Sequence, residues 1–182
     1  LTPDWAPDGN SLVIASAKTG DTELYQVSLS GKVIRQLTHS ANIDVNPSVS
    51  ADGRIAFASE RSGGLQLFVT TLAGGGASQI TYTGYQNDQP QWSPDGQQIT
   101  FCGRDQGTFD VFVMNSDGSN IQRVTRGEGS NESPTWSPDS RYIAFHSSQG
   151  GVTVIRAEGS KKTLIEKSMS CDNLDWGPWL SE

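Results

Sequence analysis

The chain has 182 residues, of which 34% are hydrophobic, with 20 Gly, 8 Pro, 5 Trp and a formal net charge of −7. This composition fits a turn-rich all-β protein and excludes a disordered chain. The negative charge disfavours nucleic acid and anionic lipid as partners, because their phosphates would repel it, and it favours a basic or neutral protein surface. No apolar run reaches the roughly 20 residues that a transmembrane helix needs, so no membrane insertion is expected.

One short phrase, close to Pro-x-Trp-Ser-Pro-Asp-Gly, recurs along the chain. Its copies begin at Pro3, Pro47, Pro90 and Pro134, which lie 44, 43 and 44 residues apart, and a decayed fifth copy covers 174–178. A period in the forties in a β-rich sequence is typical of propeller blades. We therefore predict an all-β fold, a β-propeller of four-stranded antiparallel blades.

The third repeat shows the four strands of a blade most clearly. Gln89–Trp92 leads into the turn Ser93-Pro94-Asp95-Gly96, where Pro suits the first central position and Gly the left-handed residue after it. The predicted return strand is Ile99–Cys102, the third strand Val111–Met114 and the fourth Gln122–Thr125. Four such strands make one blade.

The other repeats match it segment for segment. Their predicted strands are Leu12–Ala15, Leu24–Val27 and Arg35–Thr38, then Ile55–Ala58, Leu67–Thr70 and Gln79–Thr81, then Ile143–His146, Val152–Ile155 and Thr163–Ile165. The expected organisation is a single partial propeller over 1–182, with blades at 1–38, 45–81, 88–125 and 132–165 and a lone closing innermost strand at 172–180. We expect the N-terminal part of the parent protein to be absent and the open blade faces to favour self-association.

Three tryptophans occupy the same place in their repeats. Trp5, Trp92 and Trp136 each stand two residues after the opening proline, and we expect them to wedge between adjacent blades. Cys102 and Cys171 stand in different repeats, and two cysteines alone define neither a metal motif nor a disulfide framework, so we expect unpaired thiols.

These repeats resemble the WD40-like repeats called PD40, and more narrowly the C-terminal propeller of the TolB family of the Tol-Pal envelope system. Three stretches carry the narrower resemblance, namely 79–87, 147–151 and the ending Asp175-Trp176-Gly177-Pro178-Trp179-Leu180. The resemblance implies a six-bladed ring preceded by a smaller α/β domain, and a periplasmic protein involved in cell division, although this chain contains no signal peptide. It also implies a non-enzymatic role in binding the peptidoglycan-associated lipoprotein Pal, with other Tol proteins as further partners.

The loops that enter the innermost strands gather at one mouth of a propeller's channel. We expect an arc of acids there, Asp44, Asp88 and Glu132 with Asp172, which would receive a basic partner segment or, less readily, a cation. The alternative is that each acid caps backbone amides of its own loop. From the resemblance, the candidate partner-binding residues are Asp4, Asp44, Asn46, Ser48, Tyr82, Tyr85, Asp88, Gln91, Glu132 and Thr135.

No enzymatic activity is expected, and no catalytic residue, cofactor or metal site is predicted. The two histidines, His39 and His146, stand in different contexts, and no nucleophile elbow, phosphate-binding loop or His-Glu-x-x-His motif occurs. Two alternatives stay open. One is a PD40 propeller that gates substrate for an attached serine peptidase of the prolyl-oligopeptidase type, and the other is a sugar-binding or lyase propeller.

Overall fold

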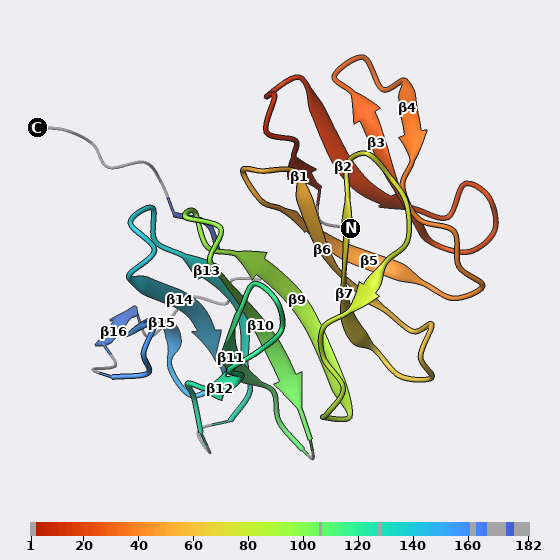
Figure 1. Ribbon diagram of the computed structural model, residues 1–182. Coiled ribbons are helices and arrows are strands. Elements are labelled where there is room, and N and C mark those ends of the chain that lie inside the picture. Colours follow the sequence, from red (N-terminus) through yellow and green to blue (C-terminus); the bar gives the residue numbers. More distant parts are fainter. Residues whose placement is uncertain (1–2, 106, 127–128, 161–162, 167–173, 177–182) are drawn as a thin grey trace, which may run out of the picture. The chain divides into compact units, whose positions relative to one another are not determined.

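The computed structural model describes residues 3–105, 107–126, 129–160, 163–166 and 174–176. All regular structure in these residues is β-strand, arranged as four antiparallel four-stranded sheets, each with its strands in chain order (Figure 1). The chain divides into two compact units, residues 1–90 and 91–182, which are treated separately below. Within the described part, no helix is long and apolar enough to cross a membrane. The predicted all-β architecture of four-stranded sheets is confirmed.

Each sheet is built from one repeat. The first sheet contains β1 (Asp4–Trp5), β2 (Ser11–Ser16), β3 (Glu23–Ser28) and β4 (Val33–Gln36), and the second contains β5 (Asp44–Val49), β6 (Arg54–Ser59), β7 (Gln66–Thr71) and β8 (Ser78–Gln79). The third contains β9 (Gln86–Trp92), β10 (Gln98–Arg104), β11 (Asp110–Asn115) and β12 (Gln122–Arg123), and the fourth contains β13 (Asn131–Trp136), β14 (Tyr142–Ser147), β15 (Gly151–Arg156) and β16 (Thr163–Glu166).

The turn after each first strand has the predicted chemistry. In the third sheet, the Gly96 N–H donates to the Ser93 carbonyl over 2.8 Å, and Gly96 has a φ of 69°. The Ser93 hydroxyl donates to Asp95 Oδ1 over 2.6 Å and accepts from the Gln98 N–H over 2.9 Å. The side chains therefore close the turn in addition to the backbone, and this fixes the register of the hairpin.

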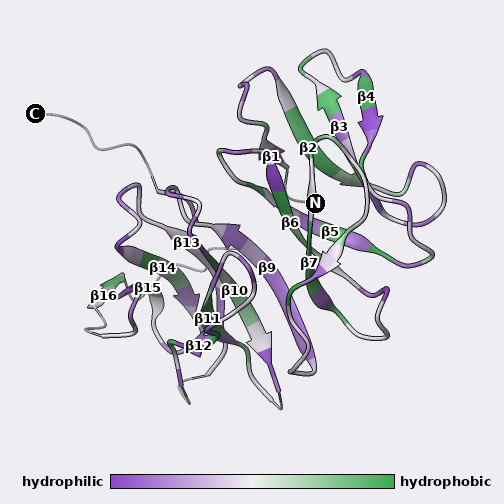
Figure 2. Cartoon of the chain, in the orientation of Figure 1, coloured by the Kyte–Doolittle hydropathy of each residue, from purple (hydrophilic) through white to green (hydrophobic). Residues whose placement is uncertain are grey.

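Hydrophobic residues concentrate in the second and third strands of the sheets, while β9 is hydrophilic along most of its length (Figure 2). Ile55, Ala56, Phe57 and Ala58 of β6 are all fully buried, so this strand is covered on both faces. Strand β2 instead alternates buried and half-buried residues. β6 is therefore buried on both faces, whereas β2 has one face that is only partly covered.

A threonine closes the end of the fourth strand in the first three sheets. In the first sheet, Thr38 Oγ1 accepts from the Leu24 N–H over 2.9 Å and donates to Glu23 Oε2 over 2.6 Å. Thr81 and Thr125 make the same pair of contacts in the second and third sheets. The hydroxyl replaces a backbone acceptor, so the fourth strands end about two residues before these threonines, earlier than the sequence predicts.

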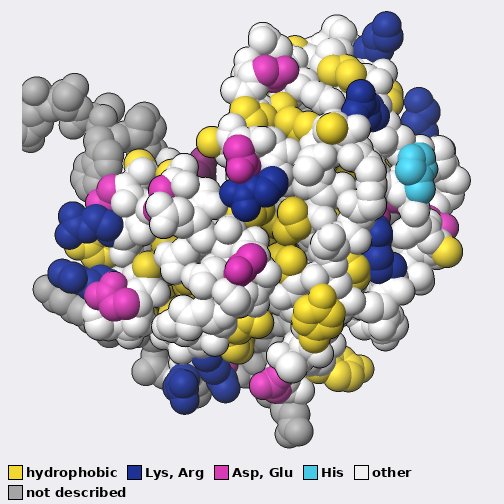
Figure 3. All heavy atoms as spheres, viewed as in Figure 1, with side chains coloured by type: hydrophobic (Ala, Val, Ile, Leu, Met, Phe, Trp, Pro, Cys, Tyr) yellow, Lys and Arg dark blue, Asp and Glu magenta, His cyan; other side chains and the backbone are white. Residues whose placement is uncertain are grey.

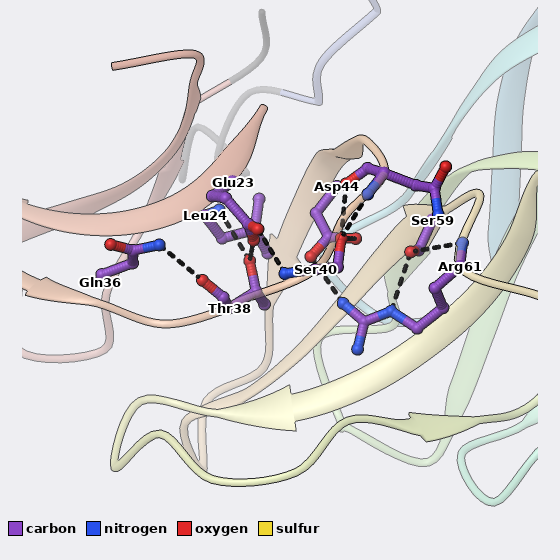
Figure 4. A network of polar contacts seen from close by, with 9 residues as sticks. Glu23, Leu24, Gln36, Thr38, Ser40, Asp44, Ser59 and Arg61 are labelled. Carbon is purple, nitrogen blue, oxygen red and sulfur yellow. Dashed lines mark hydrogen bonds and ion pairs between the residues drawn. The ribbon is translucent and has the colours of Figure 1, made fainter. Parts of the chain in front are cut away.

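In the first unit, two polar networks extend from these threonines into the next sheet. The charged network consists of Glu23, Thr38, Ser40, Asp44 and Arg61 (Figure 4). The neutral network consists of Gln66, Thr81 and Asn87. In both networks, a buried side chain at the start of the third strand accepts a hydrogen bond from the threonine. Further hydrogen bonds connect this side chain to the residue that stands three positions before the proline of the next sheet, which is Asp44 in the charged network and Asn87 in the neutral one. The charged network thus ties the first blade to the second, and the neutral network ties the second blade to the start of β9 within the first unit.

The tryptophans differ from one another in how deeply they are buried. Trp136 is only 5% exposed, and its Nε1 donates to the Gln91 carbonyl over 3.1 Å, while Trp92 is 7% exposed. Trp176 donates to the Thr135 carbonyl over 3.2 Å in the same manner. Trp5 is 56% exposed, so the expected wedge role is wrong for it in this chain. Trp136 contacts the first strand of the preceding sheet through its Nε1, whereas the Trp5 ring makes no such contact among the described residues.

The expected closing strand at 172–180 lies mostly outside the described residues, as do Asp172 and Cys171. Residues 174–176, which are described, are not assigned to a strand. The sixfold ring, the blade boundaries and the self-association of the chain stay predictions.

Candidate functional site

An unusual backbone conformation repeats near the start of three first strands, in β5 and β9 of the first unit and in β13 of the second, and we take these segments as candidate functional sites. Asn46, Gln89 and Ser133 each precede a proline and have φ values of 51°, 51° and 53°. Residues other than glycine rarely adopt this left-handed conformation, and a following proline normally favours extended backbone instead. The surrounding fold therefore imposes the same strained geometry three times.

The strain coincides with a β-bulge. The pairing of β5 with β6 shifts register between Val45 and Ser48, and the pairing of β13 with β14 shifts between Glu132 and Thr135. A bulge adds one residue to a strand and turns the side chains before it to a new direction. Repeated bulges of this kind are a common way to aim side chains at a binding site.

In the first unit, the bulge places Asn46 against Asp88. Asn46 Nδ2 donates to Asp88 Oδ1 over 2.8 Å, and the same oxygen accepts from the Gln89 N–H over 2.7 Å. Asp4 is held similarly, with Oδ2 accepting from the Val49 N–H over 2.6 Å and Oδ1 from the Trp5 N–H over 2.8 Å. Both half-buried carboxylates therefore bind backbone amides, and each also connects neighbouring first strands. Only the bond of Asp88 to the Gln89 N–H corresponds to the alternative in which an acid of the arc caps an amide of its own loop.

Asp44 does not belong with the predicted arc. It is fully buried, and its Oδ2 lies 2.6 Å from Arg61 Nη2 in an ion pair within its own sheet (Figure 4). The expected mouth position is wrong because Asp44 stands three residues before its proline, whereas Asp88 and Glu132 stand two before theirs, and alternate strand positions face opposite ways. The residues that match Asp44 are Asn87 and Asn131, which are also buried.

The remaining predicted residues fall into three groups by exposure. Ser48 and Thr135, which follow the prolines, are 2% and 9% exposed and offer little surface. Gln91 and Glu132 are half-buried. In the described residues the Glu132 carboxylate has no hydrogen bond or ion pair, so a partner's donor would meet no internal competitor there. Tyr82 and Tyr85 are 74% and 75% exposed.

Arg61 is a structural residue, and the acid that it pairs with, Asp44, lies in its own blade. Its Nε also donates to Ser59 Oγ over 2.9 Å, and its guanidinium carbon lies 5.0 Å from the centroid of the Phe68 ring. Because its partner carboxylate is fully buried, this ion pair differs from an exposed surface pair, and loss of either residue would leave a charge uncompensated.

Sequence reasoning missed the loops between second and third strands. The loop 60–65 carries Glu60 and lines, with Tyr82 and Tyr85, a hollow of about 610 Å³. The corresponding loop of the first sheet carries Asp21 and lines a hollow of about 500 Å³ with His39. The sequence signal for these loops is an acidic residue in the connection between the second and third strands of two successive repeats.

The described residues contain no group of three or more His, Cys, Asp or Glu side chains suited to hold a metal ion. Figure 3 shows Lys and Arg side chains at several places on the face in view, some of them beside Asp or Glu side chains. The geometry at the first strands is that of a preformed polar surface, suited to hydrogen bonding with another molecule.

Comparison with known proteins agrees with this architecture. The family model described as the TolB beta propeller domain, PD40, matches residues 1–180. The chain belongs to the TolB β-propeller family. A putative TolB from Agrobacterium tumefaciens is similar at 31% identity and a TM-score of 0.79, over 96% of this chain and 63% of that one.

Two more solved structures share the fold at lower identity. TolB from Acinetobacter baumannii matches at 22% identity with a TM-score of 0.76, over 88% of this chain and 41% of its own length. A puromycin hydrolase matches at 16% identity with a TM-score of 0.71, over 95% of this chain and 29% of its own. The chain thus spans 63% and 41% of the two TolB proteins.

Proposed function

We propose that this chain is the propeller part of a periplasmic TolB-type protein that binds a Pal-like peptidoglycan-associated lipoprotein, without catalysis, as part of a Tol-Pal envelope system. The observation that carries the proposal is the strained left-handed backbone at Asn46, Gln89 and Ser133, which recurs in three first strands and coincides with a β-bulge in β5 and β13. Strain held at equivalent positions of a repeat protein indicates a role other than stability. Family membership supports a partner-binding propeller over an enzyme.

Binding would proceed by shape and charge complementarity. The half-buried carboxylates Asp4, Asp88 and Glu132 and the amides of Asn46 and Gln91 supply acceptors and donors on rigid strands. Because these side chains are already positioned, little conformational entropy is lost when a partner binds. An acidic surface also raises the association rate of a basic partner segment. Other Tol proteins would be further partners of the parent protein.

The proposal is tested with the purified lipoprotein domain from the same organism and isothermal titration calorimetry. We expect Glu132→Gln to weaken binding by about tenfold, because it removes a charge that has no internal partner. The matched control is Asp139→Asn, which removes the same charge from the turn at the other end of β13. It should change affinity by less than about twofold.

Two outcomes would contradict this function. One is the absence of binding by the folded full-length parent protein, and the other is equal affinity of the two variants. The alternatives of a peptidase gate and of a sugar-binding or lyase propeller have weaker support. The puromycin hydrolase match at 16% identity concerns the fold alone. A hydrolase domain encoded next to these blades would favour the gate instead.

A further inference from the structure

We propose that the hollow lined by Glu60, Tyr82 and Tyr85 binds an arginine side chain of a basic segment in a protein partner. This inference rests on the proposed partner-binding function and names the chemistry of the partner at one loop pair. The hollow has a volume of about 610 Å³ and lies between the loop 60–65 and the loop 82–86, both in the first unit. A β-carbon built on Gly64 would lie 3.7 Å from the Tyr85 carbonyl oxygen, so the two loops approach closely.

The two tyrosines are exposed in a way that internal packing does not explain. They are 74% and 75% exposed, whereas Phe57 and Phe68 of the same sheet are 0% and 4% exposed. Tyr82 Oη donates to the Gln79 carbonyl over 2.7 Å, which holds the phenol at one end. Exposed tyrosines that are held in place lose little entropy on binding and are enriched among residues that anchor protein partners.

The charge of the hollow selects a cation. In the described residues the Glu60 carboxylate, which is exposed, has no hydrogen bond or ion pair, because the neighbouring Arg61 is committed to Asp44 at 2.6 Å. The amide groups that line the hollow are already used. Gln66 Oε1 accepts from Thr81 and Asn87, and its Nε2 donates to the Gly84 carbonyl over 3.2 Å.

The hollow therefore presents the exposed Glu60 carboxylate beside two exposed aromatic rings. A guanidinium matches both, since it pairs with a carboxylate through two N–H groups and stacks on an aromatic face. A lysine ammonium is more strongly hydrated and makes only a point contact, so it should bind less well. This is why we assign arginine to the site.

The first sheet provides an internal comparison. Its equivalent hollow, of about 500 Å³, is lined by Asp21 but by no tyrosine. Asp21 likewise has no hydrogen bond or ion pair among the described residues. Asp21→Asn therefore removes the same charge as Glu60→Gln from a matching loop, without the rings.

The test uses the 182-residue chain and the peptide acetyl-Gly-Gly-Arg-Gly-Gly-amide, followed by NMR of the tyrosine ring signals. We expect the Tyr82 and Tyr85 signals to shift, with affinity at least about tenfold weaker for the peptide in which neutral citrulline replaces arginine, and weaker for the lysine peptide. Glu60→Gln should weaken arginine binding about tenfold, while Asp21→Asn should change it less than twofold. Unchanged amide signals outside the loop that carries each substitution and its neighbouring strands would confirm that the variant is folded.

Equal binding of arginine and citrulline, equal affinity of the Glu60 and Asp21 variants, or no shift of either tyrosine would overturn the inference. Its failure is separable from failure of the proposed function. Loss of peptide binding with intact lipoprotein binding contradicts only the arginine site. Peptide binding without lipoprotein binding contradicts only the identity of the partner.

Discussion

The charged and neutral networks of the first unit have the same geometry but different chemistry. In each, a threonine hydroxyl accepts from a third-strand N–H and donates to the buried side chain before it, Glu23 in one case and Gln66 in the other. The residue contributed by the next sheet is Asp44 in the charged network and Asn87 in the neutral one. The repeat therefore conserves hydrogen-bond positions between these two networks while the charge varies.

The difference matters because buried carboxylates need more compensation than buried amides. Asp44 is fully buried and relies on Arg61 and on the Ser40 hydroxyl, which donates to Oδ1 over 3.5 Å. Removing one partner of a buried ion pair leaves an uncompensated charge, whereas removing a neutral partner leaves only an unsatisfied dipole. The charged network should therefore be the more fragile of the two.

The largest expected effect comes from Asp44→Ala. It strips Arg61 of its buried partner and should lower the free energy of unfolding by about 3–5 kcal/mol. Asn87→Ala removes the donor to Gln66 Oε1 and to the Thr83 carbonyl, at 2.9 and 2.7 Å, and should cost about 1–3 kcal/mol. Urea denaturation followed by tryptophan fluorescence measures both. Equal losses would show that the charge of Asp44 adds nothing to its hydrogen bonds.

A smaller effect should separate the two threonines. Thr38→Val and Thr81→Val each leave one buried N–H without its acceptor, and we expect about 2–4 kcal/mol for Thr38 and about 1–3 kcal/mol for Thr81. The excess at Thr38 arises because its hydroxyl donates to a carboxylate rather than to an amide. The same denaturation assay on Thr38→Ser and Thr81→Ser, which keep the hydroxyl, provides the control. A larger loss at Thr81 would contradict the comparison.

Local features of this fold were predictable from the sequence because they depend on neighbouring residues. The turn at Ser93-Pro94-Asp95-Gly96 and the hairpins around it follow from the left-handed glycine and the strand pattern. The 43- to 44-residue period predicts one sheet for each repeat. Such signals do not require knowledge of any distant contact.

The candidate site was harder to predict, since it depends on strand register. The residue before a proline is normally extended, so nothing in Asn46-Pro47 indicates a φ of 51° or the bulge that accompanies it. Without the bulge, the faces of Asp44 and Asp88 cannot be assigned, and the two acids were placed together although one is buried. Exposure of Trp5 depends likewise on which sheet precedes it. Side-chain type alone carries none of this information.

The smallest expected effect concerns two surface turns, in which an aspartate has a charged neighbour in one sheet and a neutral neighbour in another. The pKa of Asp52 falls from 3.8 to about 2, chiefly because its carboxylate accepts hydrogen bonds from the Arg54 and Ser50 side chains. Asp95 occupies the same turn position, also accepts from a serine hydroxyl, and is followed by Gln97 in place of the arginine. A lowered pKa in the folded state means that the contribution of Asp52 is present above pH 3.8 and is lost as the pH falls to about 2.

The Asp52 side chain is 60% exposed, so solvent screening should keep the effect of Asp52→Asn below about 1 kcal/mol at pH 7. Thermal unfolding by circular dichroism at pH 7, 4 and 2 measures it. The difference from the parent chain should shrink below pH 4 and be small at pH 2, because about half of the parent's Asp52 carboxyl groups are then protonated in the folded state. Asp95→Asn keeps the turn and removes a charge that faces no arginine among the described residues, so its effect at pH 7 should be smaller. A difference for Asp52→Asn that is as large at pH 2 as at pH 7 would mean that the amide disturbs the turn itself, and that charge is not what distinguishes the two positions.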